Sequence, residues 1–189
     1  MINELKQAIL EIFSFKDILK NVVDASINSP SIYLDKVFPI YQQMVELVNS
    51  LTPFTLNDVQ DFLNVALDEF SDRPFFPVLG GLFVSALINN VLRSEQHIEV
   101  DLRDLCYEVI EHSTKGATVG GEEYGEVNFS LDFLGYLQPP NTGLKLIGPV
   151  GDYAGALMRE NAILVIQGYH GNYLGHGKHE TAEIAVEEP

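Results

Sequence analysis

Three histidines near the C-terminus have the type and spacing that could bind a metal ion. His170, His176 and His179 follow an H-x5-H-x2-H pattern, and Glu180 stands beside the last of them. Imidazole nitrogens are ligands of zinc, copper and nickel, and three converging ligands with an open position make a catalytic metal site. The glycines between these histidines turn the chain repeatedly, so solvated histidines at bends are the expected arrangement. No metal or other cofactor is predicted.

Two other kinds of residue recur twenty positions apart. Asp152 and Asn172 share one slot, and Tyr153 and Tyr173 share the next. A calcium site would need an acid in both polar slots, whereas short polar side chains at a bend commonly bond their own backbone. The two tyrosines are expected to stack as ordinary packing within a repeat.

The glycine-rich stretch of residues 151–181 does not match the nucleotide-binding motifs. A dinucleotide fingerprint opens a helix, but the next apolar strand pattern begins about a dozen residues after Gly151, which leaves little room for one. In "GNYLGHGKH" the glycines lie one residue too far apart for a P-loop, and His179 stands where that motif needs Ser or Thr.

Few other residues suggest chemistry. Asp101, Asp104 and Glu108 lie near the change from helical to strand patterns and could serve a pocket there. The single cysteine, Cys106, falls on the apolar face of a short helical pattern, which favours an inert buried thiol. No Ser/His/Asp order or paired-carboxylate spacing stands out, so no catalytic or cofactor-binding residue is predicted.

The composition narrows the class of protein. The 189 residues carry a net charge of −16, which repels phosphate backbones and anionic lipid and so argues against nucleic-acid and membrane partners. One cysteine excludes an internal disulfide framework, and the N-terminus lacks the pattern of a signal peptide. A cytoplasmic location is expected.

The first 94 residues show apolar residues at three- and four-residue steps, which predicts four or five helices packed as a small bundle. Pro39 is expected to divide the second helical segment or to open its longer part. Thr55 with Asp58 predicts an N-cap. The apolar run of residues 75–92 contains Pro77, Asn89 and Asn90, which favours a buried core helix over a membrane span.

From about residue 94 the pattern changes to alternating apolar residues and glycines. Residues 97–102 alternate as a strand does. An offset of twenty then aligns strand and glycine positions in successive segments. These positions are Leu144, Leu164 and Ile184; Leu146, Ile166 and Val186; and the pairs Gly148/Gly168, Gly151/Gly171 and Gly155/Gly175. Over residues 96–142 the frame slips, and only Val127, Phe129, Leu131 and Phe133 are placed as inward-facing candidates.

This repeat predicts parallel strands that turn at glycine corners. "HIEVDLRDL" followed by "LKLIGPVGDYAGALMRENAILVIQGYHGNYLGHG" resembles the GXGXG β-helix domain that occurs in glutamate synthases and formylmethanofuran dehydrogenases, well over residues 143–189 and loosely over 96–142. The chain has fewer turns than that family, and the glycine pair near Lys178 and His179 is missing. The predicted fold class is α+β: a helical domain, residues 1–95, followed by a short single-stranded right-handed parallel β-helix with turns of about twenty residues, residues 96–189.

In the enzymes that it resembles, this domain supports and joins catalytic parts, so the resemblance implies a structural role and transfers no active site. The expected function is a non-catalytic structural or assembly protein or subunit, related to the scaffold domain of glutamate synthase-type oxidoreductases. A short stack leaves an open end to be covered, which predicts a homo-oligomer or a protein partner subunit. The alternative is an enzyme or ligand-binding protein whose pocket lies between the helices and the repeats.

Overall fold

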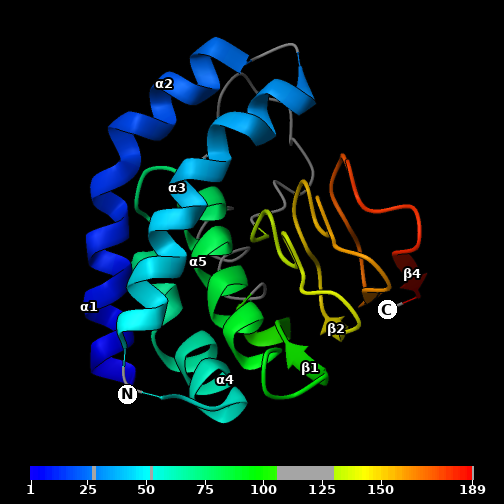
Figure 1. Cartoon of the computed structure of the whole chain (residues 1–189). Helices are drawn as coiled ribbons and strands as arrows, with labels where there is room; N and C mark the ends of the chain where they lie inside the picture. The colour runs from blue at the N-terminus through cyan, green and yellow to red at the C-terminus, as the bar shows by residue number, and fades with distance from the viewer. Residues whose placement is uncertain (27–28, 52, 106–129, 189) are drawn as a thin grey trace, which may run out of the picture.

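The computed structural model describes residues 1–26, 29–51, 53–105 and 130–188. Within them, five α-helices precede and accompany four short strands (Figure 1). The elements are α1 (Ile2–Ile12), η1 (Phe13–Phe15), α2 (Lys16–Ser26), α3 (Pro30–Ser50), α4 (Leu56–Val65), η2 (Leu67–Phe70), α5 (Phe76–Val91), β1 (His97–Asp101), β2 (Gly143–Ile147), β3 (Ile163–Gln167) and β4 (Glu183–Glu187).

The helices begin where the sequence offers caps. Thr55 and Asp58 form the predicted cap of α4 as a full capping box, in which each side chain bonds the other residue's backbone N–H. The prediction for Pro39 is wrong, because α3 runs without interruption from Pro30 to Ser50 and neither breaks nor begins at Pro39. Pro30 takes the place at the start of α3 instead, directly after the N-cap Ser29.

Helix α5 is the centre of the molecule. It is buried on nearly all sides and lies between α1, α3 and α4 and the strands (Figure 1). The prediction of a buried core helix over this apolar run is therefore confirmed. No helix among the described residues is long and apolar enough to cross a bilayer.

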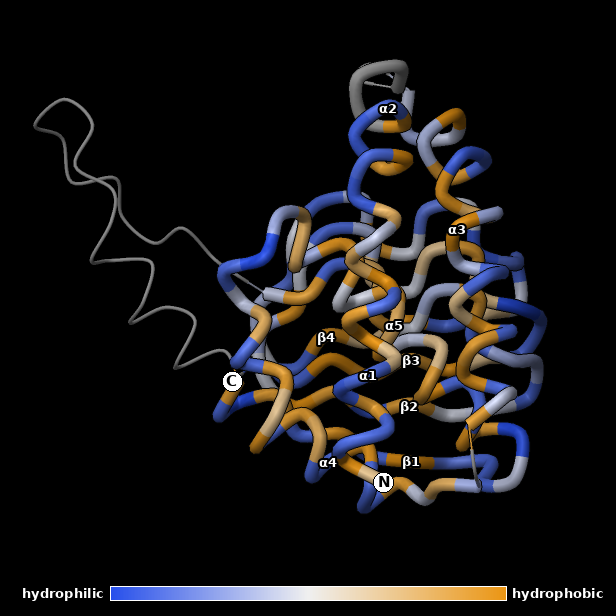
Figure 2. Tube along the Cα trace, turned by 90° about the vertical axis from the view of Figure 1, so that its left-hand side faces the viewer, coloured by the Kyte–Doolittle hydropathy of each residue, from blue (hydrophilic) through white to orange (hydrophobic). Residues whose placement is uncertain are grey.

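The strands form one parallel sheet in the order β1-β2-β3-β4. Figure 2 shows them stacked one above the other behind the helices. Leu144 pairs with Leu164, and Leu164 pairs with Ile184, as the twenty-residue offset predicts. Strand β1 pairs with β2 at a different offset, with His97 opposite Gly143.

The predicted fold class is wrong in its second half. The described residues form an α+β structure with a single four-stranded parallel sheet of five-residue strands, and no long right-handed β-helix of twenty-residue turns is evident. The physical reason lies in the residues between the strands. Apart from an isolated parallel bridge between Val150 and His170, each described segment from one repeat strand to the next is made of bends and turns, so the repeat contributes one short strand and no second sheet face.

These bends use left-handed backbone at three alternate positions in each repeat. At these three positions the residues are Phe133, Gly135 and Leu137; Tyr153, Gly155 and Leu157; and Tyr173, Gly175 and Gly177. Asn141 and Asn161, and the glycines Gly148 and Gly168, also have positive φ. Side chains with a Cβ adopt this region rarely, and extended strands exclude it. The first triplet also shows that the twenty-residue frame extends back to about residue 131 and does not slip there.

Of the inward-facing candidates predicted in this region, Leu131 and Phe133 are buried as expected. Val127 and Phe129 lie outside the described residues. The division of the chain at residues 95 and 96 stays a prediction, and one continuous core cluster contains residues from both sides of it.

One face of α5 holds the first bend of the repeats in place. Pro77 and Gly81 lie one helical turn apart on this face. The carbonyl of Pro77 accepts a hydrogen bond from the N–H of Asp132 at 2.9 Å. A Cβ on Gly81 would overlap the carbonyl oxygen of Asp132, so the helix can approach this closely only with glycine there.

The same face continues toward the end of α5 with Ser85 and Asn89. The hydroxyl oxygen of Ser85 accepts a hydrogen bond from the N–H of Tyr136 at 3.0 Å. The side-chain amide of Asn89 donates to the carbonyl of Tyr136 at 2.8 Å. Polar groups of an otherwise apolar helix thus satisfy the buried backbone of a bend that has no strand partner on this side.

Candidate functional site

The three histidines do not form a metal site. The His170 Nδ1 lies 2.8 Å from the carbonyl of Gly171, the His176 Nε2 lies 3.2 Å from the hydroxyl of Ser31, and His179 contacts Thr181. Each ring has a separate partner, and no group of three histidine, cysteine or acidic side chains in the described part of the chain could hold a metal ion.

The two acids near the junction that the structure describes, Asp101 and Asp104, do not form a shared site. Asp101 is paired with Arg103 at 2.6 Å, and this hydrogen-bonded cation lowers the pKa of the Asp101 carboxyl. Asp104 is exposed. Glu108 and Cys106 lie outside the described residues.

Asp132, Asp152 and Asn172 form a ladder across three successive bends. The Asp132 Oδ1 accepts a hydrogen bond from the backbone N–H of Asp152 at 2.8 Å, and the Asp152 Oδ1 accepts one from that of Asn172 at 2.7 Å. Each carboxylate therefore bonds the next repeat, whereas the sequence had suggested bonds within one turn. Burial raises the pKa of Asp132 to about 7, and the nearby charge of Asp152 adds to the rise although the N–H of Asp152 opposes it.

An aromatic stack runs beside this ladder. Phe133 and Tyr153 lie 5.1 Å apart with ring planes 6° from parallel, and Tyr153 and Tyr173 lie 4.7 Å apart at 16°. The predicted stacking of the two tyrosines is confirmed. Tyr33 of α3 packs against both Phe133 and Tyr153, so the helices hold the inner members of the stack.

The stack ends at an uncovered surface, which we call the open end and define by Tyr173, Leu174, Ile184 and Val186. Tyr173 is 49% exposed, whereas Tyr153, its equivalent one repeat earlier, is 8% exposed. Val186 is 48% exposed, and its equivalent Ile166 is fully buried. The open end thus presents apolar side chains that an additional repeat would bury.

Backbone groups at the open end also lack a neighbouring strand within the described structure. Strand β4 is the last strand of the sheet. Its Glu183 N–H and Glu187 carbonyl bond toward the β3 side. Successive residues of a parallel strand direct their backbone N–H and C=O groups to opposite edges of the strand. The backbone groups of Ile184 and Val186 therefore face away from β3.

The opposite edge of the sheet is occupied at the end of β1. The Gln60 side chain of α4 donates to the carbonyl of Asp101 at 2.7 Å and accepts from the N–H of Asp101 at 2.9 Å. This amide takes the place of a strand residue at the end of β1. Among the described elements, the sheet therefore has one edge that a helix side chain caps at Asp101 and one edge without a neighbour.

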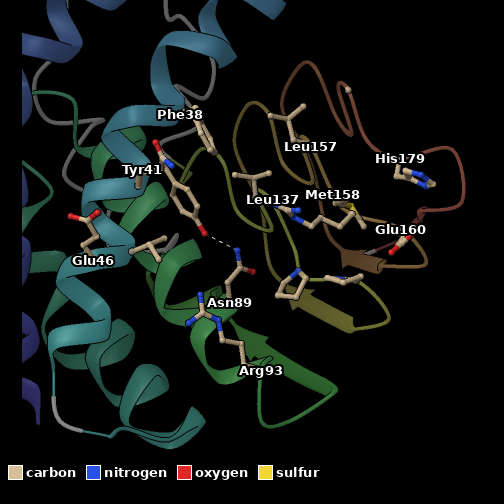
Figure 3. A pocket seen from close by; sticks show the side chains of 16 residues that line it. Phe38, Tyr41, Glu46, Asn89, Arg93, Leu137, Leu157, Met158, Glu160 and His179 are labelled. Atoms are coloured by element: carbon tan, nitrogen blue, oxygen red, sulfur yellow. Dashed lines mark hydrogen bonds between the residues drawn. The ribbon is translucent and has the colours of Figure 1, made fainter.

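A groove of about 880 Å³ lies between α3 and α5 on one side and the repeats on the other. Figure 3 shows Phe38, Tyr41 and Asn89 on the helix side, facing Leu137 and Leu157. Arg93, Arg159 and His179 also line it, together with Glu46 and Glu160. Of the predicted candidates in the described residues, only His179 lies here.

Three features of the structure are not among the sequence predictions. Asp132 shares the slot of Asp152, because "DFLGYL" repeats the pattern of "DYAGAL" twenty residues earlier. The spacing of Gly81, Ser85 and Asn89 at four-residue steps in an apolar helix was a readable signal for close packing on one face. The positions of Arg93 and Arg159 beside one groove had no sequence signal, since they depend on how helices and repeats pack.

No protein-family model, no curated protein and no solved structure matches this chain.

Proposed function

We propose that this chain is a non-catalytic assembly protein that binds another protein chain through its open end. The observation that carries the proposal is the contrast between the two edges of the sheet. Gln60 occupies the backbone groups of Asp101 at one edge, while β4 has no neighbour among the described strands at the other. A partner strand added to β4 would take up these groups and cover the apolar side chains beside them.

The exposed side chain of Tyr173 also supports the proposal that the open end is a protein interface. Aromatic rings stacked at 4.7–5.1 Å continue outward from the core to this residue. Large aromatic side chains are enriched at the centres of protein interfaces, because they bury much area with few rotatable bonds.

The test is a substitution on β4 with a matched control. Val186→Asp places a charge on the open end, and Val65→Asp places the same charge on an exposed apolar position of α4. Sedimentation velocity over a wide concentration range should show self-association of the parent chain, weakened about tenfold or more by Val186→Asp and not by Val65→Asp.

If the partner is a different protein and not a second copy of this chain, the same two variants are tested by affinity purification. If the parent chain is monomeric throughout, affinity purification from the native cell should recover a stoichiometric partner that Val186→Asp loses and Val65→Asp keeps. A monomer with no such partner, or a partner retained by Val186→Asp, would refute the proposal.

A further inference from the structure

The groove between the helices and the repeats brings two arginines together in an acidic protein, with two glutamates also in its lining. Two of the chain's four arginines, Arg93 and Arg159, line it. Arg93 donates to the neutral amide of Asn49 at 3.1 Å. Among the described residues, no carboxylate forms an ion pair with either guanidinium, although Glu46 and Glu160 line the same groove. In a chain of net charge −16, two such arginines at one concave surface indicate a place for an anion from outside.

The floor of the groove supplies a hydrogen-bond donor beside these charges. The Tyr41 hydroxyl oxygen accepts a hydrogen bond from Asn89 at 2.8 Å, so its own hydrogen must point elsewhere, and no acceptor for it is found among the described residues. The charges of Arg93 and Arg159 both act on this hydroxyl, since each opposes the rise in the pKa of Tyr41 that burial causes.

Asn89 is held in a fixed orientation at the same place. It is 6% exposed, and its amide donates to both Tyr41 and the carbonyl of Tyr136. Its Oδ1 is buried without a hydrogen-bond partner in the described structure. The polar floor of the groove is therefore preorganised by α5, and the dashed line in Figure 3 marks the bond between Asn89 and Tyr41.

The remaining walls are apolar. Phe38, Leu137, Leu157 and Met158 line the groove, and its volume is that of sites for small organic molecules. We propose that this groove binds a small organic anion, in which a carboxylate or phosphate group meets Arg93, Arg159 and the Tyr41 hydroxyl while an apolar body lies against Leu137 and Leu157. The groove is formed by residues other than those of the open end, so this site does not depend on the proposed assembly role.

The probes are octanoate and octyl phosphate, with octanamide as an uncharged ligand of similar shape. Isothermal titration calorimetry on the intact chain should show saturable binding of at least one anion, about tenfold or more tighter than octanamide. Whichever anion binds more tightly distinguishes a carboxylate ligand from a phosphate ligand. No saturable binding of either at about 10 mM, or equal binding of octanamide, would overturn the proposal.

Substitutions locate the binding. Arg159→Met should weaken the anion about tenfold, and Tyr41→Phe should weaken it about threefold or more, with little change for octanamide. Arg73→Met is the charge-matched control, since Arg73 is exposed in the loop before α5 and does not line the groove. Equal weakening by Arg73→Met would show a general charge effect and refute the site. Thermal unfolding of each variant confirms that the fold is kept.

Discussion

The presence or absence of a Cβ atom at one position of α5 determines how closely this helix can approach the repeats. Gly80 and Gly81 are neighbours on the helix, but they face different surroundings. A Cβ on Gly80 would lie 3.4 Å from the Leu131 side chain, an ordinary packing distance, whereas a Cβ on Gly81 would overlap the backbone of Asp132. The chain therefore needs glycine at position 81 for space and has room for alanine at position 80.

Gly81→Ala should lower the free energy of unfolding by about 3 kcal/mol, because the helix must move away from Asp132 and strain the bonds along this face. Gly80→Ala should be neutral or raise it by up to about 1 kcal/mol, because alanine favours the helix more than glycine does. Urea denaturation of both variants measures the difference. Similar values for the two substitutions would contradict the close contact.

The raised pKa of Asp132 makes stability depend on pH. The folded protein holds the proton of this carboxyl up to about pH 7, whereas in the unfolded chain it is lost near the ordinary value of 3.8. Between these values the folded state binds more protons, so the free energy of unfolding must fall as pH rises, by at most about 1.4 kcal/mol per pH unit for one group.

Asp132→Asn removes this titration while it keeps an oxygen that can accept from the N–H of Asp152. We expect the variant to lose less stability than the parent chain between pH 4 and about 7, measured by urea denaturation across that interval. Asp72→Asn, at an exposed position before α5, controls for the change in net charge. Parallel pH profiles of parent and Asp132→Asn would show that the carboxyl is not held protonated.

At the scale of elements, the edge of β1 depends on a single helix side chain. Gln60→Leu keeps nearly the length of the side chain but removes both hydrogen bonds to the backbone of Asp101. Because this backbone is partly buried, the substitution should lower the free energy of unfolding by about 1–3 kcal/mol.

Gln43→Leu is the control for Gln60→Leu, since Gln43 is exposed on α3 and makes only a long contact, 3.5 Å, within its own helix. Chemical denaturation of both variants is the measurement. A cost no greater than that of the control would mean that β1 does not need its cap.

The helices and the pairing of the strands could be predicted from local patterns, because both depend on residues close in sequence or at one fixed offset. Thr55 and Asp58 identified the start of α4, and the twenty-residue offset identified the partners of Leu164. The fold class was wrong because the residues between the short strands, Tyr153 and Leu157 among them, adopt left-handed backbone that an extended strand cannot contain. The periodicity of apolar residues in the sequence predicts which side chains are buried, but it does not predict the backbone angle φ of each residue.

The candidate site was less predictable. The three histidines were candidates for a metal site because imidazole binds metal ions, yet His170 and His176 contact different partners. The groove residues Arg93 and Arg159 are 66 positions apart in the sequence, and their approach depends on α5 docking against the first bend. Such a juxtaposition follows from tertiary packing, for which a single sequence carries no local signal.

At the scale of the whole molecule, the two edges of the sheet limit what assembly can form. Head-to-tail stacking would need both ends free, but α4 covers the β1 edge at Asp101. On the proposed assembly role, pairing of two chains would use the β4 edge of the described sheet, and a symmetric contact of this kind closes after one pairing. Self-association through this surface is therefore expected to stop at a dimer of 21.0 kDa chains and not to continue into filaments.

The regular offset between β2, β3 and β4 has a consequence for how such a chain can change in evolution. Asp152 donates its backbone N–H to the carboxylate of Asp132, and its own carboxylate accepts from the equivalent N–H of Asn172. If a duplication within the gene copied one twenty-residue repeat, the inserted repeat could form the same hydrogen bonds with the repeat before it and the repeat after it. Lengthening by whole units at the open end would keep the contacts between the helices and the existing repeats, whereas an insertion of any other size would misalign every contact that follows it.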